Sequence, residues 1–194
     1  MTRIIGGHAG GRRLQTPKGD LTRPTADRVR EALFSALEST LGSLSGLRFL
    51  DLYAGSGAVG LEAWSRGAAA VMLVERDRRT AATARANAAA VGCSAARVVT
   101  ASVRTVLTEA VVDAPYDVVF SDPPYATASD RVVGDLRALL GGGWLAAGGV
   151  VVVERPTRAG PVGWPEGLTE ERVRSYGETS LWSARAQDPL DAPT

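Results

Sequence analysis

The tetrapeptide Asp122-Pro123-Pro124-Tyr125 combines residue types that can bind and orient a nucleobase amine. Two consecutive prolines fix their φ angles and remove two amide donors, which leaves stiff, outward-facing carbonyl groups. The Asp122 carboxylate and the Pro123 carbonyl can accept both hydrogens of an exocyclic amine and direct its lone pair toward a methyl donor, so that alignment supplies most of the acceleration. Tyr125 offers a flat face on which an extruded base can stack, worth about 1–3 kcal/mol. The alternatives are a rigid turn with a surface tyrosine and, for Asp122, a helix cap.

A glycine-rich loop forms the second motif, within the segment Asp51-Leu-Tyr-Ala-Gly-Ser-Gly-Ala-Val-Gly60. Gly55 and Gly57 allow a tight turn and a close approach of the backbone to a ligand. Glu75, which follows later, can accept hydrogen bonds from ribose hydroxyls, and the spacing also satisfies the dinucleotide fingerprint. S-adenosylmethionine is favoured because the Asp51 carboxylate would stabilise its cationic end but repel a pyrophosphate. NAD binding and a tight turn without a ligand remain the alternatives.

Short apolar runs alternate with helical patterns and must hold these motifs in place. The alternation is typical of a doubly wound α/β fold, in which helices cover a parallel sheet and ligands bind at the carboxyl ends of the strands. Both motifs follow predicted strands. We predict strands at 47–53, 70–75, 97–101, 117–121 and 149–154, an antiparallel hairpin of 170–176 and 179–186 turning at Gly177, and helices at 25–41, from the glycine loop to about Arg66, from the cap Asp77 to the stop Gly92, at 102–112 and at 130–141.

The composition is that of an ordinary globular protein. A chain of 194 residues predicts one domain with at most a small appendage, and 45% hydrophobic with 22% charged residues excludes wholesale disorder. Cys93 is the single cysteine, which excludes a disulfide framework and a multi-cysteine zinc site, and we expect no metal. The sequence has no apolar run of about 18 residues and no signal-peptide core, so we expect a cytoplasmic protein.

Positive charge is concentrated near the N-terminus. Residues 1–30 contain seven basic and two acidic residues, whereas the remaining chain contains fifteen basic and nineteen acidic ones. Residues 3–16 alternate around a glycine-rich centre and predict a hairpin, residues 17–24 predict a loop, and Thr25 is expected to cap the following helix. A basic arm on a mildly acidic body favours a polyanionic partner held at one edge.

The arm supplies the candidate nucleic-acid contacts. Contacts to phosphate position a protein on a nucleic acid without specifying its sequence. The alternative is a solvated hairpin face, and for the only histidine, His8, an ordinary surface position instead of a stacking one. The candidates are Arg3, His8, Arg12, Arg13, Lys18 and Arg23.

Five segments distributed over nearly the whole chain carry a resemblance to a known family. They are Arg3-Ile-Ile-Gly-Gly7, Gly11-Arg-Arg-Leu14, Arg23-Pro-Thr-Ala-Asp-Arg-Val-Arg-Glu-Ala-Leu-Phe34, Asp51-Leu-Tyr-Ala-Gly-Ser-Gly57 and Asp122-Pro-Pro-Tyr125. With them the chain resembles the RsmD family of bacterial 16S rRNA guanine-N2 methyltransferases. The resemblance implies a class I, Rossmann-like methyltransferase with a seven-stranded, mostly parallel sheet, a terminal antiparallel hairpin, and an N-terminal β-hairpin that helps to bind the ribosomal substrate.

The same resemblance assigns roles in cofactor and base binding. Asp51, Gly55 and Gly57 would hold the methionine end of S-adenosylmethionine, Glu75 the ribose and Arg76 the adenine side. Ser102 stands where such enzymes often place Asp or Asn, so it would replace that contact to the adenine amine only in part. Thr25 and Arg28 would close over the cofactor, and Asp122 to Tyr125 would hold the guanine. The predicted cofactor set is Thr25, Arg28, Asp51, Tyr53, Gly55, Gly57, Glu75, Arg76, Ser102 and Val103.

We therefore expect an S-adenosylmethionine-dependent enzyme that methylates the N2 amine of a guanine in 16S rRNA. Its expected partner is the 30S ribosomal subunit or an assembly intermediate, and we expect a monomer with no membrane contact. The predicted organisation is a basic hairpin extension at 1–24, a methyltransferase domain at 25–187 and a flexible tail at 188–194. A DNA base methyltransferase (adenine-N6 or other) and a non-catalytic RNA-binding assembly factor remain the alternatives, with an NAD oxidoreductase a distant one.

Overall fold

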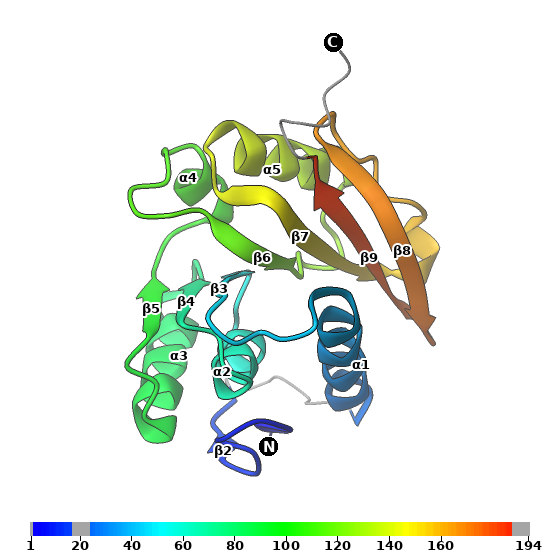
Figure 1. Cartoon of the computed structure of the whole chain (residues 1–194). Helices are drawn as coiled ribbons and strands as arrows, with labels where there is room; N and C mark the ends of the chain where they lie inside the picture. The colour runs from blue at the N-terminus through cyan, green and yellow to red at the C-terminus, as the bar shows by residue number, and fades with distance from the viewer. Residues whose placement is uncertain (1, 17–23, 188–194) are drawn as a thin grey trace. The chain divides into compact units, whose positions relative to one another are not determined.

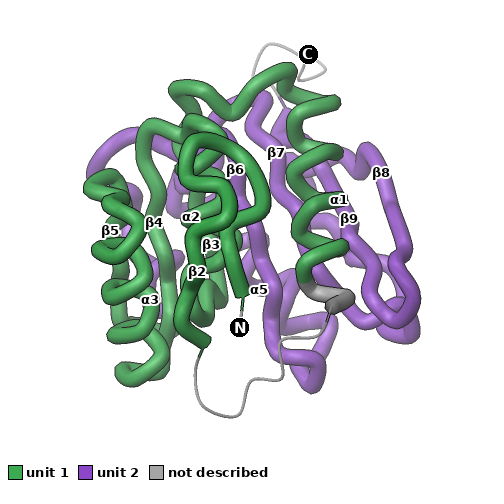
Figure 2. The backbone as a smooth tube through the Cα atoms, turned by 90° about the horizontal axis from the view of Figure 1, so that it is seen from below, with its two compact units in different colours: residues 1–102 green, residues 103–194 purple. Residues whose placement is uncertain are grey.

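The computed structural model describes residues 2–16 and 24–187, with no description of the side chains of residues 24–26. The chain forms two compact units, residues 1–102 (unit 1) and 103–194 (unit 2), which Figure 2 shows in green and purple. The predicted tail at 188–194, and the predicted phosphate contacts Lys18 and Arg23, lie outside the described residues. The predicted division into extension, methyltransferase domain and tail stays a prediction.

Unit 1 contains three parallel strands in the order β5-β4-β3 (Figure 1). β4 is a continuous apolar run, whereas β3 contains Arg48 and Asp51; in each strand the four residues after the first are buried, as expected for strands covered on both faces. The elements of this unit are β1 (Thr2–Arg3), β2 (Arg13–Leu14), α1 (Pro24–Leu41), β3 (Arg48–Leu52), α2 (Ala58–Ser65), β4 (Ala70–Val74), α3 (Arg78–Val91) and β5 (Ala96–Val99).

Local signals explain where the helices of unit 1 begin and end. The Asp77 side chain caps α3 by accepting a hydrogen bond from the Thr80 amide at 2.8 Å, and Gly92 ends the helix with a φ of 75°, as predicted. The predicted cap at Thr25 is wrong, because α1 already begins at Pro24. A proline suits the first turn of a helix, where its missing amide has no partner to lose.

Unit 2 contains four strands in the order β6-β7-β9-β8. β6 and β7 are parallel, whereas β9 runs antiparallel to both β7 and β8. The β8–β9 hairpin turns at Gly177, whose φ is 62°, as predicted. The elements are α4 (Val103–Leu107), β6 (Tyr116–Ser121), α5 (Ser129–Gly141), β7 (Leu145–Pro156), the 3-10 turn η1 (Thr157–Ala159), β8 (Leu168–Tyr176) and β9 (Thr179–Ala186).

Two predicted elements of unit 2 have different lengths in the structure. The helix predicted at 102–112 ends at Leu107, because the chain beyond it is tied to the end of α5: the Trp144 indole N–H donates to the Glu109 carbonyl at 2.8 Å, and the Val111 amide donates to the Gly142 carbonyl at 3.0 Å. β7 begins four residues before the predicted start at residue 149. The predicted α/β class, with parallel strands and a terminal antiparallel hairpin, is confirmed.

Candidate functional site

The turn that joins β3 to α2 has an unusual backbone. Tyr53 has a φ of 63°, and it is the only residue other than glycine with a positive φ in the described part of the chain. Such a conformation costs of the order of 1–3 kcal/mol and is concentrated at ligand-binding sites. Gly55 (φ 56°) and Gly57 (φ 81°) follow, so the loop needs glycine at both positions. A Cβ at Gly55 would have no atom within 4 Å, which leaves open space beside the loop.

The Asp51 carboxylate lies beneath this turn. Its side chain is buried, and its Oδ2 atom accepts a hydrogen bond from the Gly60 amide at 2.9 Å in the first turn of α2. Gly60 also allows close packing, because a Cβ there would overlap Leu73 Cδ2 on β4. Asp51 therefore fixes the helix start after the glycine loop, and its contact with a cofactor stays a prediction.

Glu75, at the end of β4, faces the same loop. Its Oε2 atom accepts a hydrogen bond from the Gly55 amide at 3.1 Å, and its Oε1 atom accepts one from the Asp77 amide at 2.7 Å. Each carboxylate oxygen has two lone pairs, so both can also accept a hydroxyl hydrogen. An acceptor of this kind beside the open space at Gly55 fits the ribose and methionine portions of S-adenosylmethionine.

The remaining predicted cofactor residues have varied environments. Arg28 on α1 and Arg76 after β4 are exposed, and Ser102 is half-buried at the end of unit 1. Val103 opens α4 in unit 2 and is buried. Thr25 lies in the first turn of α1, where its side chain is not described.

In unit 2, the Asp122–Tyr125 motif follows β6 directly. Asp122 is half-buried and Pro123 is buried, whereas Pro124 is exposed and its carbonyl accepts the Thr127 amide at 2.7 Å. Tyr125 is 52% exposed, and its hydroxyl lies 3.2 Å from Thr179 Oγ1 at the start of β9. The tyrosine is therefore held at its hydroxyl end while much of its ring remains accessible, as a stacking platform requires.

Glu154, near the end of β7, was not recognised as a site residue from the sequence. The register pairs Ser121 with Val153, so Glu154 follows next to Asp122 on the neighbouring parallel strand. Burial, and second the negative charge of Asp122, raise the pKa of Glu154 to about 8. The signal was present, because Glu154 ends an apolar run in the same way that Glu75 does.

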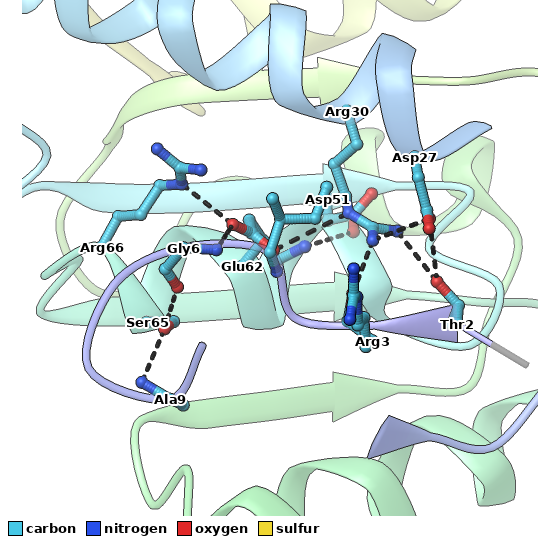
Figure 3. A network of polar contacts seen from close by, with 12 residues as sticks. Thr2, Arg3, Gly6, Ala9, Asp27, Arg30, Asp51, Glu62, Ser65 and Arg66 are labelled. Carbon is cyan, nitrogen blue, oxygen red and sulfur yellow. Dashed lines mark hydrogen bonds and ion pairs between the residues drawn. The ribbon is translucent and has the colours of Figure 1, made fainter. Parts of the chain in front are cut away.

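A buried carboxylate anchors the N-terminal hairpin (Figure 3). Glu62 on α2 is fully buried, and it accepts hydrogen bonds from the amides of Ile5 at 2.6 Å and Gly6 at 2.7 Å, and from Arg66 Nε at 3.0 Å. The Arg30 guanidinium lies 3.8 Å from the same carboxylate. This network ties the hairpin to α2.

Arg30 is one of the seven basic residues among residues 1–30, but the structure places it in the interior of unit 1. It is 6% exposed, and it donates hydrogen bonds to the Arg3 carbonyl at 2.6 Å and to Asp27 Oδ1 at 3.0 Å (Figure 3). The Arg30 guanidinium therefore stabilises the fold and is not accessible to a phosphate group.

Two further contacts hold the hairpin. The Ala9 amide donates to Ser65 Oγ at 2.9 Å. The buried Asn87 side chain on α3 accepts from the Gln15 amide at 2.7 Å and donates to the carbonyls of Gln15 and Ser56, both at 2.9 Å. Ser56 belongs to the glycine loop, so one side chain links this loop to the hairpin.

The described residues of the predicted phosphate-binding set lie together on this hairpin. Arg3, His8, Arg12 and Arg13 are all exposed. His8 contacts the Trp64 ring edge-on, with ring centroids 4.3 Å apart, and Arg12 donates to the Val91 carbonyl at 2.7 Å. The hairpin thus exposes basic side chains, while hydrogen bonds to α2 and α3 hold its backbone in place.

None of the described helices has the length and hydropathy that a membrane span requires. The part of the chain that the structure describes also contains no cluster of three or more His, Cys, Asp or Glu side chains placed to hold a metal ion.

Comparisons with known proteins agree with this arrangement. Residues 2–185 match the family described as "Conserved hypothetical protein 95". The chain is 36% identical to "Ribosomal RNA small subunit methyltransferase D" of Escherichia coli K12 over 98% of this chain and 93% of the relative, and 32% identical to the Haemophilus influenzae protein of the same name over 92% and 90%. A solved Escherichia coli structure, described as "Putative methyltransferase yhhF", has a TM-score of 0.83 and 32% identity, covering 95% of this chain and 97% of that one.

These likenesses confirm the family and the fold class that were predicted from the sequence. Both the glycine loop of unit 1 and the Asp122–Tyr125 motif of unit 2 lie within the matched residues. The chain belongs to the RsmD family, the family of ribosomal RNA small subunit methyltransferase D.

Proposed function

We propose that this protein transfers a methyl group from S-adenosylmethionine to the exocyclic N2 amine of a guanine in small-subunit ribosomal RNA. The observation that carries the proposal is the Asp122–Tyr125 motif, held at the end of β6 with an accessible tyrosine ring, in a chain of the RsmD family. The expected partner is 16S rRNA in the 30S subunit or one of its assembly intermediates. Action as a monomer in the cytoplasm stays a prediction from the sequence.

Unit 1 supplies all but one of the proposed cofactor residues. S-adenosylmethionine supplies a methyl group that is already activated by its sulfonium. The Glu75 carboxylate accepts hydrogen bonds from the ribose hydroxyls, and Gly55 and Gly57 let the backbone lie against the methionine portion. Asp51 keeps the loop in shape through the Gly60 amide and adds a negative charge beneath it. Tyr53, Arg76, Ser102, Thr25 and Arg28 complete the proposed set within unit 1, and Val103 is its one member in unit 2.

Unit 2 supplies the residues for the target base. The Asp122 carboxylate and the Pro123 carbonyl accept the two N2 hydrogens, which fixes the amine and frees its lone pair for attack on the methyl group. As the bond between N2 and the methyl carbon forms and the methyl–sulfur bond breaks, the electron pair stays on the sulfur of the leaving thioether, and the surplus N2 proton passes along the hydrogen bond to Asp122. Tyr125 stacks on the extruded base, with its hydroxyl held by Thr179.

The N-terminal hairpin is the proposed docking element for RNA. Arg3, Arg12 and Arg13 contact phosphate and His8 stacks on a base, with Lys18 and Arg23 continuing the set beyond the described hairpin. Support comes from the exposure of the four described residues and from the buried anchor at Glu62, which keeps them in fixed positions.

The direct test combines the protein and methyl-labelled S-adenosylmethionine with three acceptors: unmodified 30S particles, naked 16S rRNA and duplex DNA. Nucleoside mass spectrometry then identifies the product. We expect N2-methylguanosine from an RNA acceptor. Methylated DNA bases with unlabelled RNA would replace this proposal by DNA base methylation, and RNA binding without any methyl transfer would indicate an assembly factor.

A further inference from the structure

Among the described residues of unit 2, none forms a hydrogen bond or an ion pair with the Glu154 carboxyl group, and Asp122 is the charged neighbour that acts on it. It is half-buried at the end of β7, directly after four buried valines, Val150–Val153. A half-buried polar group without a partner costs free energy, so the presence of a glutamate at this position requires an explanation. The proposed function leaves this group without a role.

Its position relates it to the residues proposed to hold the base. Glu154 follows the Ser121–Val153 pair, so it lies beside Asp122, at the roughly 4.8 Å spacing of neighbouring strands. On its other side it pairs with Leu181 of β9, and two residues further along the same face Pro156 pairs with Thr179, the residue that holds the Tyr125 hydroxyl. Glu154 therefore lies between Asp122 on one side and, on the other, the strand that carries Thr179, which contacts the Tyr125 hydroxyl.

The charged groups around it within unit 2 are few. Asp122 faces it from β6, and the neighbouring positions on β9, Leu181 and Thr179, carry no charge. Arg155 points to the other face of the sheet, where it donates to Ser129 Oγ of α5 at 3.1 Å. Because burial and the Asp122 carboxylate both disfavour a second negative charge, the pKa of Glu154 lies near 8 and its carboxyl group is largely neutral at pH 7.

We propose that Glu154 is a specificity-determining residue for the target base, which pairs with the N1–H and O6 groups of guanine while Asp122 and Pro123 hold the N2 amine. This inference rests on the proposed function and identifies the residue that discriminates guanine from other bases. A neutral carboxyl group carries an acceptor next to a donor. Guanine offers the complementary pair, a donor at N1–H and an acceptor at O6, immediately beyond its N2 amine.

Other bases with exocyclic amines do not match this pattern. Adenine and cytosine carry a ring acceptor beside the amine, with no N–H at that position, so at most one of the two hydrogen bonds forms. A site built to hydrogen-bond a substrate discriminates strongly against analogues that leave its polar groups unpaired. The sequence motif at Asp122 is common to enzymes acting on several amines, and Glu154 supplies the distinction that this motif lacks.

The test uses two variants and one base analogue in the full-length protein. Glu154→Gln keeps an acceptor next to a donor but cannot ionise, whereas Glu154→Ala removes both groups. The RNA acceptor carries 2-aminopurine at the position where mass spectrometry finds N2-methylguanosine; this base keeps the 2-amino group but lacks N1–H and O6. The exposed Glu166→Gln variant is the matched control.

On guanine RNA at pH 7, we expect kcat/KM to fall about 100-fold in Glu154→Ala and no more than about threefold in Glu154→Gln. The wild-type preference for guanine over 2-aminopurine should shrink in Glu154→Ala by a similar factor. Affinity for S-adenosylmethionine should be unchanged, which excludes a folding defect. An undiminished preference in Glu154→Ala would overturn the inference while leaving guanine methylation intact.

The pH profile supplies a second readout. Wild-type kcat/KM should decline as the pH rises through about 8, because the ionised carboxylate no longer donates to O6 and repels Asp122. Glu154→Gln should lack this decline, and the same decline in both proteins would contradict the inference.

A titration of the Glu154 side-chain carboxyl carbon by NMR needs no activity, so it remains informative even if the proposed function fails. We expect a midpoint near 8, lowered in Asp122→Asn because a neighbouring negative charge is removed. A midpoint in the ordinary range of a glutamate would overturn the neutral carboxyl on which the inference depends.

Discussion

In unit 1 the carboxylates Asp51 and Glu75 near the strand ends accept hydrogen bonds from backbone amides, whereas the Glu154 carboxyl group has no such donor among the described residues of its own unit. Asp51 holds the Gly60 amide, and Glu75 holds those of Gly55 and Asp77. Acidic side chains in unit 1 therefore shape a loop before any ligand arrives. The difference fits the proposal that the glycine loop takes its shape before the cofactor binds, whereas the base site keeps hydrogen-bonding capacity for its substrate.

The strongest way to break this comparison is Asp122→Ala. We expect loss of methyl transfer by at least about 1,000-fold, because orienting the reacting amine supplies most of the acceleration. Cofactor affinity should stay within about tenfold of the wild type, since the proposed cofactor set lies mostly in unit 1 and does not include this carboxylate. Isothermal titration with S-adenosylmethionine and single-turnover methylation measure the two quantities. Full activity in this variant would remove the proposed mechanism.

Glu62→Ala tests whether a carboxylate of unit 1 is structural. The change leaves the amides of Ile5 and Gly6 without their acceptor and removes a buried charge beside Arg30, so the free energy of unfolding should fall by about 3–5 kcal/mol. Chemical denaturation checks this, with the exposed Glu31→Ala as the control. Equal stability of the two variants would show that the hairpin needs no buried anchor.

Glu75→Ala sharpens the comparison, because this carboxylate is proposed to serve both the loop and the cofactor. We expect affinity for S-adenosylmethionine to fall about 10- to 100-fold, as hydrogen bonds to a charged acceptor contribute about 1.5–3 kcal/mol. Calorimetric titration measures the change against the exposed Glu109→Gln. Unchanged affinity would leave Glu75 with the loop contacts alone.

The smallest expected effect is that of Arg13→Gln on the exposed hairpin. One lost phosphate contact should weaken RNA binding uniformly and reduce the slope of log affinity against log salt by about 1. Filter binding over a range of salt concentrations checks this, with Arg79→Gln on the exposed part of α3 as the control. An identical slope in both variants would exclude Arg13 from the interface.

Features set by short stretches of sequence were predictable. The cap at Asp77, the stop at Gly92 and the turn at Gly177 depend on one or two residues, and all three are found as predicted. The strand ends that carry Glu75 and Asp122 followed from apolar runs of ordinary length.

Features that depend on distant partners were not predictable in this way. The burial of Arg30 and the role of Glu62 require the hairpin backbone to meet α2 across more than fifty residues. Glu154 acquires its meaning only when β7 pairs with β6, and the early end of α4 depends on contacts with the end of α5.

The hydrogen bonds of Asn87 have a consequence for engineering this enzyme. Through Gln15 and Ser56, one amide joins the element proposed to grip RNA to the loop proposed to cradle the cofactor. The hairpin therefore cannot be transferred alone. Grafting it onto another methyltransferase would also require the residues of α2 and α3 that bind it, and deleting it from this protein would remove one support of the glycine loop.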